Sequence, residues 1–304
     1  MLPLDPAQQD LVNHALAQDP QPIGGSTNVN GVHEVTFDNG SVGFFKAASA
    51  EAQHLKGSDN PYGDFYKNEI GAYQVDQALG LGLVPTTAPF VGPDSLGDQG
   101  KGIGSIQAMV QPPNDRMAPT DYSAVDQQKM AVLDYVIGNG DRHGANWLTQ
   151  ASPNDPLAPA PAAIDNGMAF PTEIHQGVGL RSDFVNNALN KPLDPSVLDA
   201  VNNVNQGALE QKLADSGISQ QGIDLAMARL NEIKSNGMIT GSAFQGGSFM
   251  SGDGKQWTQD SSQPVAQWGD SPWKPMFTAQ EQQQAADELA QRIRDGNVPP
   301  PGGP

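Results

Sequence analysis

The sequence predicts an α+β protein in which a strand-rich N-terminal part precedes a larger, mainly helical part. In the N-terminal part, apolar and polar residues alternate on both sides of the turn signal Asp38-Asn39-Gly40, which is typical of a β-hairpin. Beyond residue 120 the apolar residues recur at the spacing of amphipathic helices. A loop of glycines and polar residues follows the first of these helices near Asp141, and we interpret it as the centre of a functional site.

Composition narrows the possible partners and compartments. The 304 residues can form one large bilobal domain or two small ones. With 34 acidic and 16 basic residues the net charge is -18, so phosphate-rich nucleic acid should be repelled and no nucleic-acid role is expected. The absence of cysteine excludes disulfides and thiolate metal sites. No apolar run reaches transmembrane length and no signal-peptide pattern is visible, so we expect no direct membrane insertion. The expected location is cytoplasmic, or outside the cell by a route without a cleaved signal.

Local patterns place the elements of the N-terminal part. We expect a short helix over residues 5–18 and a hairpin over residues 32–46. A second helix should begin with Asp64 as its cap and end at Gly80, where glycine permits the left-handed conformation. Two short strands are expected within residues 88–112.

The C-terminal part is expected to be helical up to about residue 237. An amphipathic helix over residues 121–137 delivers the loop at Asp141, and further helices are expected near residues 194–205, 206–215 and 219–236. Residues 238–275 show few regular signals, and a polar helix over residues 278–294 precedes a tail that should be disordered.

The run LDYVIGNGDRHGANWLTQ, followed after a Pro/Ala-rich spacer by AIDNGMAF, has the layout of a phosphoryl-transfer site. Asp141, Asn146 and Asp165 supply the hard oxygen ligands that Mg²⁺ prefers, and Mg²⁺ needs few of them because water and phosphate oxygens complete its shell. Asp and Asn beside glycine are also common in turns, and a DNG step alone is typical of a hairpin. The pair of motifs is more specific than either half.

Together these motifs resemble the catalytic and metal-binding loops of the phosphatidylinositol 3/4-kinase superfamily, with the closest likeness to the type II phosphatidylinositol 4-kinases. The likeness covers about residues 24–235 and includes the FFK step at Lys46 and the NEIGAYQVDQALGLGLVP block. In the central run, the matching residues are Asp134, Tyr135, Asp141, Arg142, Asn146, Trp147, Leu148, Ala163 to Gly167, Ala169, Phe170 and Pro171.

The resemblance implies a bilobal, protein-kinase-like fold with ATP and Mg²⁺, or alternatively Mn²⁺, between the lobes. Asp141 would orient the acceptor hydroxyl or accept its proton, and Asn146 and Asp165 would hold the metal. Lys46 would contact the phosphates and Glu69 would hold Lys46 in place. Nucleotide-binding positions would be the glycine-rich turn and the strand that leads to the adenine pocket, namely Gly24, Gly25, Ser26, Gln107, Met109 and Val110. Asp134 is expected to be a buried hydrogen-bonding residue that orders the loop.

This interpretation divides the chain into a catalytic domain over residues 1–237 and an extension over residues 238–304. The N-lobe should span about residues 1–110 and the C-lobe about residues 111–237. The predicted function is ATP- and Mg²⁺-dependent transfer of the γ-phosphate to a protein Ser/Thr or another soluble hydroxyl acceptor. This is favoured over a lipid acceptor because the cysteine-rich insert and basic membrane-facing surface of the type II lipid kinases are not visible. The alternatives are a lipid kinase recruited by a partner and a non-catalytic nucleotide-binding protein.

Overall fold

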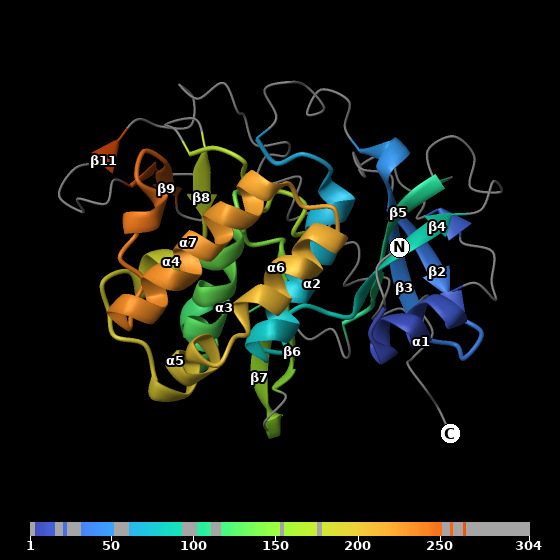
Figure 1. The fold of residues 1–304 in the computed structure, drawn as a ribbon. Helices are drawn as coiled ribbons and strands as arrows, with labels where there is room; N and C mark the ends of the chain where they lie inside the picture. Colours follow the sequence, from blue (N-terminus) through green and yellow to red (C-terminus); the bar gives the residue numbers. More distant parts are fainter. Residues whose placement is uncertain are drawn as a thin grey trace.

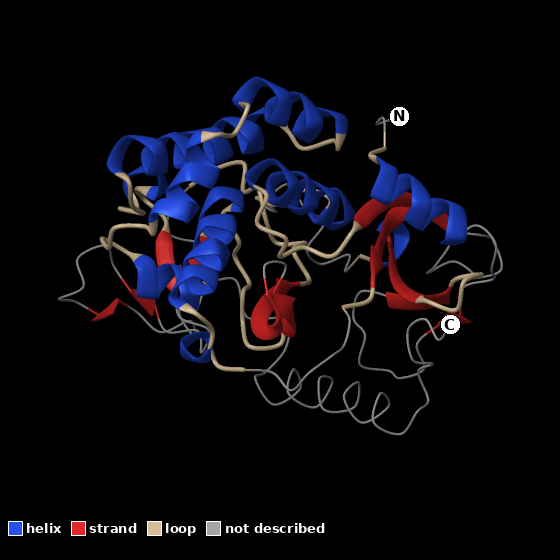
Figure 2. Cartoon of the chain, turned by 90° about the horizontal axis from the view of Figure 1, so that it is seen from below, coloured by secondary structure: helices blue, strands red, loops and turns tan. Residues whose placement is uncertain are grey.

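The computed structural model of the chain forms two lobes, a β-rich lobe beside a larger helical lobe (Figure 1). Figure 2 shows the same division from below, with the strands of the N-terminal sheet at one end and most helices at the other. The predicted bilobal α+β fold is therefore confirmed. The structure describes residues 4–15, 21–22, 32–51, 61–92, 102–110, 117–152, 155–174, 178–250, 256–257 and 264–265. The predicted polar helix over residues 278–294 lies outside these residues.

The N-lobe is built on a five-stranded antiparallel sheet with the order β1-β2-β3-β5-β4. Helix α1 (Pro6–Ala15) packs on this sheet and completes a small apolar core with it. The short helix and both pairs of strands were predicted from the sequence pattern. The strands are β1 (Gln21–Pro22), β2 (Val32–Thr36), β3 (Val42–Ala47), β4 (Thr87–Gly92) and β5 (Gly102–Ala108).

The β2–β3 hairpin determines which way Lys46 faces. Its turn contains Gly40 at a φ of 80°, a left-handed conformation that glycine adopts without strain. Phe45 points into the core of the N-lobe, where it packs edge-to-face against Phe90. Because side chains alternate along a strand, the neighbouring Lys46 faces the opposite side, toward the helical lobe. The 3-10 helix η1 (Ala48–Ala50) follows β3.

Helix α2 (Phe65–Leu79) contacts the N-terminal sheet and also the helical lobe. It ends as predicted at Gly80, which has a φ of 63°. Asp64 occupies the cap position, but the expected side-chain cap is wrong, because its carboxylate pairs with Lys67 at 2.7 Å. Instead, Glu51 reaches across from the preceding segment and accepts a 2.8 Å hydrogen bond from the Tyr66 N–H.

The C-lobe is a helical bundle around α3, whose last residues are fully buried. Side chains of Ser123, Asp194, Asn205 and Ser219 cap four of its helices by accepting backbone N–H bonds, as expected for these residue types. The three helices predicted near residues 194–205, 206–215 and 219–236 are present, and the short helix α4 was not predicted from the sequence. The 3-10 helix η4 (Pro119–Asp121) precedes α3 (Ala124–Ile137), α4 (Asp183–Ala188), α5 (Pro195–Asn202), α6 (Gln206–Asp215) and α7 (Gln220–Asn236).

The Pro/Ala-rich spacer forms a strand that the sequence pattern did not indicate. Strand β7 (Asp155–Ala163) pairs with β6 (Trp147–Ser152) in an isolated antiparallel hairpin. Pro159, Pro161 and Ala163 are alternate residues of β7, so their backbone nitrogens lie on the same side of the strand. The Ala163 N–H points away from β6 and donates to the Leu83 carbonyl at 2.8 Å. The missing N–H groups of the prolines therefore fall on the outer edge, where a ribbon of two strands tolerates them.

Residues beyond the predicted boundary at residue 237 pack onto the helical lobe. Ile239, Phe244 and Phe249 belong to the main apolar core. Strand β9 (Ser248–Met250) pairs in parallel with β8 (Gly179–Arg181), after the 3-10 helix η5 (Ser242–Phe244). Two short strands, β10 (Gln256–Trp257) and β11 (Pro264–Val265), extend this sheet. The segment up to Met250 thus stabilises the lobe, and the division into domains stays a prediction.

Asp76 near the end of α2 makes the stability of the fold depend on pH. It is fully buried, accepts a hydrogen bond from the Leu83 N–H at 2.9 Å, and burial raises the pKa of its carboxyl to about 7. The folded state binds this proton more tightly than the unfolded state, so this contribution to the free energy of unfolding should fall as the pH rises from about 4 to about 7.

Asp76→Asn keeps the acceptor for Leu83 and removes the titration. The free energies of unfolding of the wild type and of Asp76→Asn are measured with urea at roughly pH 5 and pH 8. The value of the variant relative to the wild type should be higher at pH 8 than at pH 5. A difference that does not change with pH would contradict this assignment.

Candidate active site

A buried ion pair between Asp134 and Arg142 fixes the loop after α3. Asp134 on α3 is fully buried, as predicted, and its carboxylate accepts hydrogen bonds from Arg142 Nε at 3.0 Å and Ser182 Oγ at 2.7 Å. Gly138 ends α3 in the left-handed conformation, and Gly140 packs so tightly against Tyr62 that a side chain would collide with its hydroxyl. The turn at Asp141 is thus set by packing as well as by hydrogen bonds.

Arg142 connects this loop to the metal loop. Its Nη1 donates to the carbonyls of Asn146 at 2.5 Å and Ile164 at 2.6 Å, and its Nη2 donates to Asn166 Oδ1 at 2.5 Å. In the sequence Arg142 is only one residue of the DRHGAN motif, and no local pattern indicates the partners of a charged residue that is fully buried in this way. The contacts make Arg142 the residue that fixes the two loops relative to each other.

Two side chains lie beside the Asp141 carboxylate, and one of them donates a hydrogen bond to it. Arg181 Nη1 donates to its Oδ1 at 2.9 Å, and His143 Nε2 lies 3.4 Å from its Oδ2. His143 Nδ1 accepts a 3.1 Å hydrogen bond from the Ala145 N–H, which places the other ring nitrogen, Nε2, toward Asp141. Neither Arg181 nor His143 was a predicted site residue. His143 stands in the DRH step, whereas no motif marks Arg181.

The β6–β7 hairpin brings the two predicted metal ligands to the same end. Asn146 directly precedes β6 and Asp165 follows β7, and the Ile164 N–H donates to the Asn146 carbonyl at 3.1 Å. Asn146 Nδ2 donates to the Asp141 carbonyl at 2.7 Å, so its amide is oriented by the loop at Asp141. Asp165 has a φ of 53°, a strained conformation for a residue other than glycine, and such strain is often found at functional sites.

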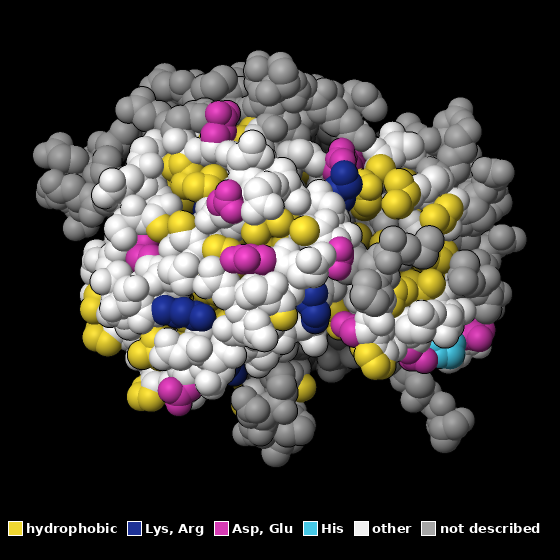
Figure 3. All heavy atoms as spheres, in the orientation of Figure 1, with side chains coloured by type: hydrophobic (Ala, Val, Ile, Leu, Met, Phe, Trp, Pro, Cys, Tyr) yellow, Lys and Arg dark blue, Asp and Glu magenta, His cyan; other side chains and the backbone are white. Residues whose placement is uncertain are grey.

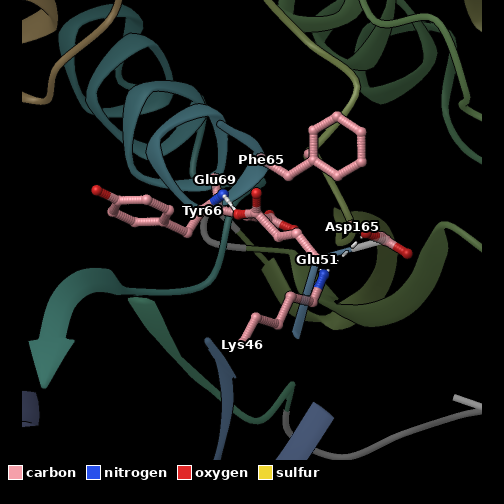
Figure 4. Close-up of a pocket in the computed structure, with 7 residues that line it drawn as sticks. Lys46, Glu51, Phe65, Tyr66, Glu69 and Asp165 are labelled. Atoms are coloured by element: carbon pink, nitrogen blue, oxygen red, sulfur yellow. Dashed lines mark hydrogen bonds and ion pairs between the residues drawn. The ribbon is translucent and has the colours of Figure 1, made fainter. Parts of the chain in front are cut away.

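Lys46 bridges the lobes (Figure 4). Its Nζ donates to Glu69 Oε1 at 2.5 Å and to Asp165 Oδ1 at 2.8 Å. Burial alone would lower the pKa of Lys46, but the two carboxylates outweigh it and raise that pKa well above its usual value. Burial would likewise raise the pKa of Asp165, but Lys46 holds it below its usual range. Both groups therefore stay charged at neutral pH.

Glu69 connects α2 to the metal loop through its second oxygen. Glu69 Oε2 accepts a 2.9 Å hydrogen bond from the Asn166 N–H, directly after Asp165. Since Asn166 also accepts from Arg142, one continuous network of polar contacts runs from α3 through both loops to β3. A small hollow opens beside it, lined by Lys46, Asp165 and the first residues of α2.

The predicted adenine-binding positions lie where β5 ends. Gln107 pairs with Phe44 of β3 and donates through Nε2 to Thr87 Oγ1 at 2.9 Å, while the Met109 N–H donates to the Val42 carbonyl at 3.0 Å. Val110 is buried. These positions stay predictions for nucleotide binding. The predicted phosphate-contacting residues Gly24, Gly25 and Ser26 lie outside the described residues.

The side chains of Asn146 and Asp165 fit a metal ion that also takes phosphate oxygens as ligands. Within the described residues, no group of three or more His, Cys, Asp or Glu side chains is placed to hold a metal ion by itself. Asp165 is ionised and its side chain is 48% exposed, and the Asn146 amide is oriented at the same end of the hairpin. One carboxylate and one amide are typical of Mg²⁺ sites that phosphates complete.

Comparisons with known proteins agree with this geometry. The family model described as phosphatidylinositol 3- and 4-kinase matches residues 109–180, which include Asp141, Asn146 and Asp165. No curated protein sequence matches the chain. Among solved structures, the Golgi casein kinase with Mn/ADP bound has a TM-score of 0.52 and 16% identity, with 75% of this chain and 73% of that chain covered. A second Golgi casein kinase structure has a TM-score of 0.52, 16% identity and coverages of 77% and 75%. The structure of hydra Fam20 with sugar has a TM-score of 0.48, 14% identity and coverages of 78% and 90%.

The fold is therefore kinase-like, and the matched segment contains the predicted catalytic and metal loops. The fold is thus that of kinases, and residues 109–180 are similar to the phosphatidylinositol 3- and 4-kinases. The matching family model is general to phosphatidylinositol 3- and 4-kinases, so the resemblance to the type II enzymes stays a prediction. No helix within the described part of the chain is long and apolar enough to cross a membrane.

Proposed function

We propose that this protein transfers the γ-phosphate of ATP, with Mg²⁺ or Mn²⁺, to a hydroxyl of a protein Ser/Thr or another soluble acceptor. The observation that carries the proposal is the placement of Lys46 between Glu69 and Asp165, at 2.5 and 2.8 Å. A lysine held by a helix carboxylate beside a metal-binding Asp is the arrangement that kinases use to fix nucleotide phosphates. The Golgi casein kinase with Mn/ADP bound supports nucleotide and metal use in this fold.

Each residue has a distinct role in the proposed reaction. Asp165 and Asn146 would hold the metal, which supplies charge neutralisation on the phosphates. Lys46 binds the phosphates and Glu69 keeps it oriented. Asp141 aligns the acceptor hydroxyl. Transfer forms a P–O bond to the acceptor oxygen and breaks the bond to the leaving ADP, and the hydroxyl proton passes to Asp141.

Lys46 and Glu69 should differ in the size of their effects. Lys46→Met is expected to lower turnover by about 100-fold or more, because it removes a charge at the developing phosphoryl oxygens. Glu69→Gln should cost roughly tenfold, because it only loosens the lysine. Steady-state ADP release from Mg-ATP measures both. Lys67→Met is the matched control. Lys67 lies on the same helix as Glu69, pairs with Asp64 and has no role in the proposed site. Equal losses in all three variants would contradict these roles.

The charges of the described residues favour a soluble acceptor over a lipid one. Arg142, Arg181 and Arg229 are buried and cannot meet a membrane. On the face shown in Figure 3, Lys and Arg are few and lie among Asp and Glu. Each basic residue near an anionic bilayer is worth about 1 kcal/mol, so this face offers little attraction. The Golgi casein kinase is named for a protein substrate, which agrees with a protein acceptor.

We therefore expect negligible binding to phosphoinositide-containing liposomes at physiological salt, and phosphorylation of protein Ser or Thr, the chain itself included, in preference to phosphatidylinositol. Vesicle co-sedimentation and labelling with γ-labelled ATP test this, and Lys46→Met supplies the background. Robust co-sedimentation, or lipid labelling well above protein labelling, would favour a lipid kinase that a partner recruits. Nucleotide binding without any transfer would favour a non-catalytic protein.

A further inference from the structure

We infer that Arg181 is a positioning residue that holds Asp141 by one carboxylate oxygen and leaves the other for the acceptor hydroxyl. This inference rests on the proposed kinase function. The family-model match ends at residue 180, one residue before Arg181, so that match does not include it.

The backbone places Arg181 opposite Asp141. Its N–H donates to the Asn139 carbonyl at 2.9 Å, and its carbonyl accepts from the Arg142 N–H at 2.9 Å. These two contacts lie on either side of Asp141 in the chain. Arg142 and Ser182 continue the pairing as a parallel bridge. The side chain of Arg181 therefore starts from a point that the catalytic loop itself defines.

The side chains make a one-sided contact. Arg181 Nη1 donates to Asp141 Oδ1 at 2.9 Å, and the Arg181 side chain is only 6% exposed while that of Asp141 is 25% exposed. Asp141 therefore keeps an exposed part although Arg181 itself is almost entirely enclosed. An acceptor hydroxyl can approach that exposed part.

The contact limits how Asp141 can act. A carboxylate with two free oxygens can rotate and bind a hydroxyl in several orientations. With Oδ1 held, Oδ2 is left at a defined position, 3.4 Å from His143 Nε2. In a loose phosphoryl-transfer transition state, alignment of the acceptor matters more than proton removal. A misplacement of about 1 Å at such a position can cost about 100-fold in rate.

The test compares Arg181→Met, which keeps bulk and loses the donor, with Arg181→Lys, which keeps a donor and a charge. The assay follows autophosphorylation with γ-labelled ATP and Mg²⁺, and ADP release, with ATP affinity measured by a fluorescent nucleotide. We expect Arg181→Met to lower turnover by about 100-fold with the ATP Kd changed by less than about twofold, and Arg181→Lys to recover about tenfold of that loss. Arg229→Met is the control, because Arg229 is an equally buried arginine that donates to the Val136 carbonyl on α3.

Three results would overturn the inference: equal turnover in the Met and Lys variants, near-wild-type turnover in both, or a loss of ATP affinity as large as the loss of turnover. Should Arg181→Met not fold, Arg181→Leu takes its place, since leucine is smaller and also lacks a donor. Thermal unfolding shows which variants are folded. A wild-type protein without ATP-dependent transfer would instead refute the proposed function, so the two failures are distinguishable.

Discussion

Replacing Asp165 by alanine is expected to lower metal-dependent ATP turnover by about 1000-fold or more. Asp165 is the ionised carboxylate of the metal loop and one of the two partners of Lys46. Its loss would remove both the proposed metal ligand and the contact that joins this loop to β3. A thousandfold loss corresponds to about 4 kcal/mol of transition-state stabilisation, which is reasonable for a metal ligand.

Two further variants separate this catalytic effect from a structural one. The backbone of Asp165 is left-handed, and alanine there is strained by about 1 to 2 kcal/mol. Asn tolerates this conformation, so Asp165→Asn should keep the melting temperature and still lose most of the turnover. Asp199→Ala removes an exposed carboxylate on α5 and should change turnover by less than about twofold. Substantial turnover in a folded Asp165→Asn variant would contradict the assigned role.

Replacing Arg142 by methionine is expected to lower the free energy of unfolding by about 3 to 5 kcal/mol. The substitution takes the Arg142 hydrogen bonds from the Asp134 carboxylate, two carbonyls and the Asn166 side chain in the interior of the fold. Burial raises the pKa of Asp134, and Arg142 opposes that rise, so without Arg142 this carboxyl will tend to take up a proton. In a chain of this size the loss corresponds to roughly 10 °C in melting temperature.

A double-mutant cycle identifies the origin of that loss. If the cost comes from an unpaired buried charge, Asp134→Leu added to Arg142→Met should restore part of the stability. Urea unfolding of the two single variants and the double variant measures the coupling. Additive losses would show that the two residues stabilise the fold independently and would contradict the ion-pair explanation.

The elements with clear local patterns were predictable from the sequence. The hairpin at Asp38-Asn39-Gly40 and the helix capped by Ser219 follow from turn and cap chemistry, which acts over a few residues. The helix expected over residues 121–137 instead begins at Ala124, after the Ser123 cap. The order of hairpin, lysine, helix and loop also placed Lys46, Glu69 and Asp165 in one site. Their placement together is a property of the fold that the resemblance implied.

Other parts of the site depend on contacts that no local pattern encodes. Strand β7 reads as a loop because of its prolines, and only the pairing with β6 shows that their missing N–H groups face outward. Arg181 comes from a strand far along the chain, so only the parallel bridge to the catalytic loop explains its contact with Asp141. Glu51 replaced the expected Asp64 cap because the backbone of the preceding segment brings its carboxylate to α2.

The central claim is that the chain transfers the γ-phosphate of ATP, and differently labelled ATP tests it most directly. Wild-type protein and the Asp165→Asn variant are incubated with Mg²⁺ and ATP labelled on either the γ- or the α-phosphate, with lysate proteins and mixed phosphoinositides as acceptors. We expect labelling from γ-labelled ATP alone, mainly on protein, and no labelling with the variant. Label from the α-phosphate, which would indicate nucleotidyl transfer, or no labelling from either ATP, would contradict it.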